Sequence, residues 1–220
     1  MVTGTPLPTL PVSVADPGDR EERQRLTRRA RRLTQLGLAW HALEAAIAIV
    51  AGSIAGSVAL VGFGADSVIE AVAGFVVLWL VTGDRLSSQR AERRAQQLIC
   101  VSFVTLGAYV ATESARDLIA GNHPAVSWAG VALAATTLVV MPPLAGVKRR
   151  VGAALGSSAS TSESRQTMLC AYLSAALLVG LLANALAGWW WADPIVALLI
   201  ATVALSEARE AWRGEACTCC

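Results

Sequence analysis

Residues 44–70 read EAAIAIVAGSIAGSVALVGFGADSVIE and hold two apolar segments on either side of the short sequence GSIAGS. Both segments continue outward, so one apolar run covers residues 36–54 and the next covers residues 58–81. A helix needs about 20 apolar residues to cross the hydrocarbon core of a bilayer. The stretch therefore predicts a hairpin of two transmembrane helices, whose small residues let the two backbones approach closely.

Four further apolar runs follow, at residues 98–119, 127–147, 166–186 and 194–208. The 220 residues are 55% hydrophobic and 15% charged, whereas a soluble domain carries about 25% charged residues. We predict an all-α polytopic membrane protein with six transmembrane helices in residues 33–213. A disordered tail and a basic segment precede them (1–32), and a Cys-rich cytoplasmic tail follows (214–220).

The lysines and arginines are unevenly distributed among the connecting segments. Of the 18, all but Arg116 fall in the N-terminal segment, in the loops after the second and fourth spans, or in the C-terminal tail. Because basic residues stay on the cytoplasmic side, both termini are expected in the cytoplasm. Lys148 then belongs to a cytoplasmic loop, and residues 156–164 (GSSASTSES) are expected to form a flexible linker. The net charge of +2 gives no reason to expect a nucleic-acid partner.

Two carboxylates lie deep in the second predicted span. Asp66 and Glu70 are four residues apart, so their side chains share one helical face. Ionisable residues inside a span are costly and are usually functional. Two ionised carboxylates this close repel each other unless one is protonated or a cation lies between them. We interpret the pair as a metal site at which protons compete; the alternative is a pair satisfied by hydrogen bonds to neighbouring helices.

Polar residues of the first and fifth spans are further candidates. Gln166, Cys170 and Ser174 share a face of the fifth span, where a thiolate and an amide oxygen are plausible metal ligands. The alternative for Cys170 is a small packing residue. Glu44 lies within the first span and is a candidate for a proton or metal pathway, and His41 lies near the inner end of that span, at the interface or at the site.

Three of the five cysteines lie in the last four residues: Cys217, Cys219 and Cys220. Thiols stay reduced in the cytosol, so this cluster is a candidate for binding a soft metal ion. Palmitoylation, or no role, are the alternatives. The sequence contains no His-Glu-x-x-His, Gly-x-Ser-x-Gly or Gly-rich phosphate-binding motif, which argues against an enzyme.

Residues 44–70 and 192–200 (ADPIVALLI) resemble the cation diffusion facilitator family of divalent-metal transporters. The resemblance implies six spans with cytoplasmic ends and a tetrahedral ion site formed by one pair of residues on the second span and one on the fifth. These pairs fall on Asp66 and Glu70, and on Gln166 and Cys170. Family members commonly carry a cytoplasmic C-terminal domain, so the short tail here implies a short form.

The resemblance implies a secondary transporter in the plasma membrane that forms a homodimer, exports zinc-like divalent cations in exchange for protons and needs no resident cofactor. The alternative is a non-transporting membrane protein that keeps the fold as a metal-responsive or scaffold partner. That alternative rests on the fifth-span pair, in which neither residue is His or Asp.

Overall fold

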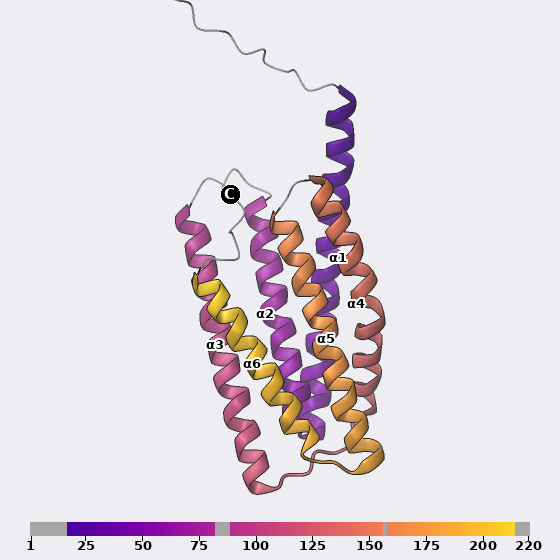
Figure 1. Ribbon diagram of the computed structural model, residues 1–220, viewed down its shortest axis with the longest axis vertical. Coiled ribbons are helices and arrows are strands. Elements are labelled where there is room, and N and C mark those ends of the chain that lie inside the picture. The colour runs from indigo at the N-terminus through magenta and orange to yellow at the C-terminus, as the bar shows by residue number, and fades with distance from the viewer. Residues whose placement is uncertain (1–16, 82–88, 156–157, 214–220) are drawn as a thin grey trace, which may run out of the picture.

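The computed structural model describes residues 17–81, 89–155 and 158–213. In these ranges the chain forms six α-helices, which confirms the predicted all-α class. The helices are α1 (Pro17–Ala55), α2 (Val58–Val81), α3 (Gln89–Ala120), α4 (Trp128–Leu155), α5 (Ser158–Ala187) and α6 (Ala192–Arg213), arranged as one elongated bundle (Figure 1). The pairs α1–α2, α4–α5 and α3–α6 pack most extensively, and α1 also packs on α4.

Three of the described helices contain a segment long and apolar enough to cross a membrane. The segments are Gln24–Ala55, Trp128–Leu155 and Ser164–Ala187, and they correspond to the first, fourth and fifth predicted spans. Large apolar side chains on these helices, such as Leu36 and Val179, are exposed on the bundle surface, where a lipid environment suits them. For α2, α3 and α6 the transmembrane assignment stays a prediction.

Glycines allow α1 and α2 to approach each other closely in their hairpin. Gly56 has a φ of 67° at the turn, a conformation that glycine adopts without steric cost. A Cβ on Gly52 would lie 2.8 Å from the backbone nitrogen of Val61, and a Cβ on Gly64 would lie 2.9 Å from the Cβ of Ala48. Because any larger side chain at these two positions would force the helices apart, the glycines fix which residues of α1 face which residues of α2.

The start of α6 is fastened to the same turn. Ser57 donates its hydroxyl hydrogen to one carboxylate oxygen of Asp193, and the backbone N–H of Ala59 donates to the other at 3.2 Å. The hydroxyl oxygen of Ser57 also accepts from the N–H of Leu60 at 3.0 Å. Ser57 and Asp193 thus satisfy backbone donors at the first turn of α2, and they join three helices at one end of the bundle.

Two expectations about the ends of helices were wrong. The linker expected at residues 156–164 is helical from Ser158 onward, and the hydroxyl of Ser164 donates to the carbonyl of Ala145 on α4 at 3.0 Å. Packing against α4 thus makes a segment helical whose composition favours a linker. Lys148 is not in a loop but inside α4, and only 4% of it is exposed. The basic segment before the first span is helical as part of α1, which begins at Pro17; residues 1–16, most of the tail expected to be disordered, lie outside the described residues.

Candidate metal centre

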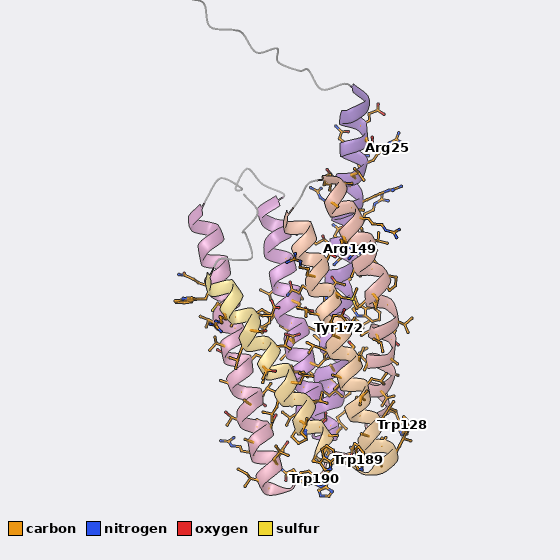
Figure 2. The ribbon with its side chains drawn as sticks, in the orientation of Figure 1. Arg25, Trp128, Arg149, Tyr172, Trp189 and Trp190 are labelled. Atoms are coloured by element: carbon orange, nitrogen blue, oxygen red, sulfur yellow. The ribbon has the colours of Figure 1, made fainter. Side chains whose placement is uncertain are left out.

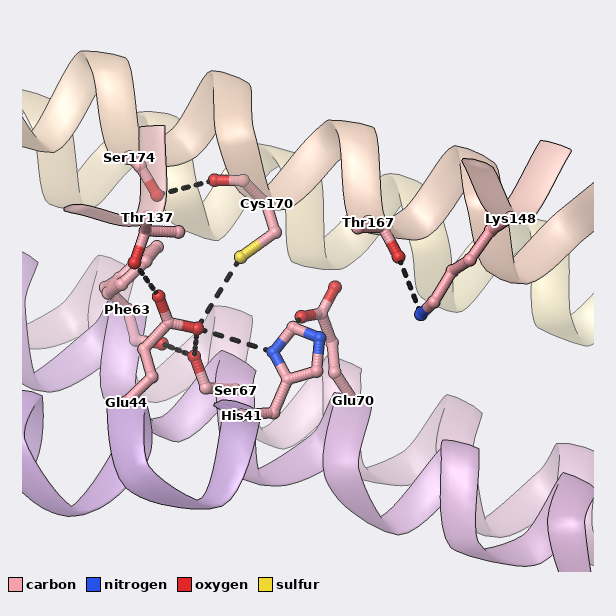
Figure 3. A network of polar contacts seen from close by, with 10 residues as sticks. All are labelled: His41, Glu44, Phe63, Ser67, Glu70, Thr137, Lys148, Thr167, Cys170 and Ser174. Atoms are coloured by element: carbon pink, nitrogen blue, oxygen red, sulfur yellow. Dashed lines mark hydrogen bonds and ion pairs between the residues drawn. The ribbon is translucent and has the colours of Figure 1, made fainter. Parts of the chain in front are cut away.

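A cluster of buried polar side chains lies between α1, α2, α4 and α5 (Figure 3). At its centre is Glu44, which is fully buried. The hydroxyl of Ser67 on α2 donates to Oε2 of Glu44 at 3.0 Å, and the hydroxyl of Thr137 on α4 donates to Oε1. Both carboxylate oxygens are therefore oriented by neighbouring helices, as is usual for residues that bind an ion.

His41 lies one turn before Glu44 and faces two carboxylates. Its Nδ1 is 3.3 Å from Oε2 of Glu44 and 3.2 Å from Oε2 of Glu70. In the described part of the chain, neither Nδ1 of His41 nor Oε2 of Glu70 has a hydrogen-bond partner of acceptable geometry. Nδ1 of His41 and one oxygen each of Glu44 and Glu70 thus converge without being aligned for hydrogen bonds to one another, and a cation between them would remove the repulsion.

Cys170 on α5 completes the arrangement. Its Sγ lies 3.7 Å from Oε2 of Glu44, and the ligand atoms of His41, Glu44 and Cys170 all lie within 4.8 Å of one another. Two nitrogen or oxygen ligands of a tetrahedral zinc ion lie about 3.3 Å apart, and a sulfur and an oxygen ligand about 3.5 Å apart. The three separations of 3.3, 3.2 and 3.7 Å are close to these values. His41, Glu44 and Cys170 can therefore hold one divalent ion with little rearrangement, and Glu70 contacts this group through His41.

The two carboxylates of α2 have different surroundings. Both Asp66 and Glu70 are buried, but it is Glu70 whose side chain contacts His41. Asp66 lies within electrostatic range of Glu44 and of Glu207 on α6. Asp66 therefore adds negative charge to the region, while a carboxylate oxygen of Glu70 lies against His41 of the cluster.

The remaining candidates of the sequence analysis lie at varying distances from the cluster. Gln166 is half-buried one turn before Cys170, and the hydrogen bonds and ion pairs of the cluster among the described residues do not include it; its role as a ligand stays a prediction. Ser174 is buried and donates to the carbonyl of Cys170 at 2.7 Å, so its hydroxyl hydrogen is occupied within α5. The tail cysteines lie outside the described residues: Cys217, Cys219 and Cys220.

Sequence reasoning missed four residues in or beside the cluster: Ser67, Thr137, Lys148 and Thr167. Ser67 directly follows Asp66, and Thr137 lies in the middle of an apolar run. A hydroxyl in a span usually bonds to its own helix, so nothing in the sequence distinguished these two from Thr136, which donates to the carbonyl of Ala132.

A cavity of about 500 Å³ beside the turn between α1 and α2 is a weaker candidate. Its lining includes Glu113 and Asp117 of α3. Glu113 pairs with Arg116 at 2.6 Å, and Asp117 accepts a hydrogen bond from the side-chain amide of Asn122 at 2.7 Å. Because both carboxylates already have partners, the buried cluster is the better candidate for binding an ion.

A comparison with known protein families finds a match to a cation-transporting domain. The sequence profile of the cation efflux transmembrane domain matches residues 35–213, a range that contains every residue of the buried cluster. A search of curated proteins finds none that matches this chain.

Proposed function

This chain belongs to the cation efflux family of membrane transporters, and from that premise we propose that it exports a zinc-like divalent cation in exchange for protons. Membership makes it an integral membrane protein and a cation transporter of the cation diffusion facilitator kind rather than an enzyme. The identity of the ion, the direction of transport and the exchange for protons are our proposals. Export across the plasma membrane and a homodimeric assembly likewise stay predictions.

The observation that carries the proposal is the position of His41 Nδ1 between oxygens of two buried carboxylates. One nitrogen, two carboxylate oxygens and one sulfur form a ligand set suited to zinc or to a softer ion such as cadmium. We propose that the ion binds to His41, Glu44, Glu70 and Cys170, with Asp66 adding negative charge. This set replaces part of the expected one, because two ligands come from α1.

The same arrangement supports exchange for protons. A proton on His41 relieves the repulsion between the carboxylates as a metal ion does, and a metal ion requires the ligands in their deprotonated forms. Metal and protons then bind to the site alternately. A transporter that loads metal on one side and protons on the other needs no further device to couple the two flows.

Transport can be measured with the purified protein in sealed vesicles, using Zn, Cd, Co, Mn and Fe at two pH gradients. We expect uptake of Zn and Cd, which becomes faster when the vesicle interior is more acidic than the outside. Binding without flux would favour the non-transporting alternative, and flux that ignores the pH gradient would refute the exchange.

In the same assay, Cys170→Ser is expected to lower the preference for Cd over Mn by about tenfold, because a hydroxyl is a harder ligand than a thiolate. Cys100→Ser is the matched control, since Cys100 is also a buried cysteine but lies on α3 in the apolar core.

The distribution of charged and aromatic residues supports the proposed orientation. Arg25 and Arg149 lie toward one end of the bundle, whereas Trp128, Trp189 and Trp190 lie at the other (Figure 2). Arginines mark the cytoplasmic side, and tryptophans collect at membrane interfaces. We therefore propose that α1 begins and α6 ends on the cytoplasmic side.

Cysteine labelling tests the orientation. With the tail cysteines replaced by serine, Asn122→Cys is expected to react with an impermeant reagent added to intact cells, because it lies in the exposed turn after α3. Arg149→Cys is expected to react only after the cells are permeabilised. Labelling of Arg149→Cys in intact cells would reverse the orientation and, with it, the proposed direction of transport.

A further inference from the structure

Lys148 is a buried cation on the α4 side of the polar cluster. Its ammonium group donates a hydrogen bond to the hydroxyl of Thr167 on α5 at 3.2 Å. On the opposite side it lies against α1, where a Cβ on Gly37 would be only 2.8 Å from Nζ of Lys148. A lysine at this place in a span normally extends to the water interface. Burying its charge instead is costly unless other charges compensate for it.

The candidate metal centre supplies negative charge near this ammonium group. Gly37 lies four residues before His41, and Thr167 lies three residues before Cys170, so the ammonium group lies about one helical turn from the cluster. Lys148 is within electrostatic range of Glu70, whose charge it attracts. In Figure 3 the ammonium group of Lys148 lies on the Glu70 side of the cluster.

Lys148 lies on the side of the cluster that faces the start of α1. The neighbours of Lys148 on α1 and α5 precede the ligands on those helices, so the lysine lies toward the end where α1 begins and α4 ends. In the proposed orientation this is the cytoplasmic end.

We propose that Lys148 is a tethered counter-cation of the transport site. Its fixed positive charge partly neutralises the buried carboxylates when no metal is bound, and it repels the metal ion when one is bound. It thereby weakens binding and speeds release. Gly37 leaves the room that the ammonium group needs, and Thr167 holds it there. This inference rests on the proposed ion site.

The test compares zinc binding by the full-length protein in lipid nanodiscs, titrated at constant pH, for wild type, Lys148→Met and Arg149→Met. Methionine keeps most of the volume of the lysine stem and removes the charge. We expect Lys148→Met to bind zinc about tenfold more tightly, since a unit charge at the edge of a buried site has an effect of at least this order. Arg149 is exposed on the neighbouring position of α4, so Arg149→Met is expected to change the dissociation constant less than twofold.

Transport by the same variants separates this role from a structural one. In vesicles, Lys148→Met is expected to lower both KM and the maximal rate, because the ion binds tightly and leaves slowly. A residue that only supports packing would raise KM or reduce the amount of folded protein. An unchanged or weaker zinc affinity in Lys148→Met would overturn the counter-cation role. If the wild type still bound and transported zinc, the proposed function would remain intact. A wild-type protein that binds no zinc would overturn both.

Should Lys148→Met not fold, Gly37→Ala gives a second test in which the charge is kept. The added methyl group occupies the place of the ammonium group and is expected to drive the flexible stem outward to water, so that zinc binds about threefold more tightly. Gly146→Ala is the control, because a Cβ there has no atom within 4 Å. Equal dissociation constants for these two variants would contradict the proposal.

Discussion

Glu44→Gln is expected to abolish metal transport in vesicles and to weaken zinc binding by about a hundredfold or more. The glutamate is fully buried, and its Oε2 lies 3.3 Å from Nδ1 of His41 and 3.7 Å from Sγ of Cys170. The substitution keeps the size of the side chain but removes the charge that two other ligands face. If the amide oxygen turns toward Thr137, the amide nitrogen takes the position of a ligand atom and cannot bind a metal ion.

Protein abundance is not expected to fall in this variant, because a neutral amide is easier to bury than a carboxylate. Thr137→Val gives a graded comparison: it removes the donor to Oε1 of Glu44 and is expected to weaken zinc binding about tenfold. Thr136→Val is its matched control, since the hydroxyl of Thr136 bonds to its own helix. Wild-type transport by folded Glu44→Gln would remove α1 from the ion site.

Glu70→Gln is expected to reduce zinc affinity and transport by at least about tenfold, and by more than Asp66→Asn does. The reason is geometric. Oε2 of Glu70 lies 3.2 Å from Nδ1 of His41, whereas Asp66 affects the cluster through its charge. For Asp66→Asn we expect about a threefold loss. Both variants are measured by zinc titration in nanodiscs and by uptake into vesicles.

The exposed Glu21 provides the control for charge removal, because 75% of its side chain is accessible and Glu21→Gln is expected to behave as the wild type does. A larger loss in Asp66→Asn than in Glu70→Gln would contradict our ligand set. It would place the ion nearer the face of α2 that is directed at α6, where the carboxylates of Asp66 and Glu207 are within electrostatic range of each other.

The pattern of apolar residues was sufficient to predict the helices. Five of the six predicted spans lie wholly inside the helix at the corresponding position, and the span predicted at 127–147 begins one residue before α4. Composition failed to predict the helix where packing against another helix overrode the local preference of the sequence. Residues 158–164 are rich in serine, yet they are helical because Ser164 bonds to α4 and the segment continues a packed helix.

The sequence by itself determined that the chain is a helical membrane protein with two carboxylates on one face of its second helix, because apolar length and helical periodicity act along a single segment. It could not determine which polar residues meet. His41 and Glu44 were lesser candidates, and the tertiary structure places them at the centre of the cluster. The register of α1 against α2, which Gly52 and Gly64 fix, brings His41 to Glu70. The packing of α4 and α5 on this hairpin then decides that Thr137, Lys148 and Cys170 surround it, since contacts between helices depend on their relative rotation and not on the spacing within any one of them.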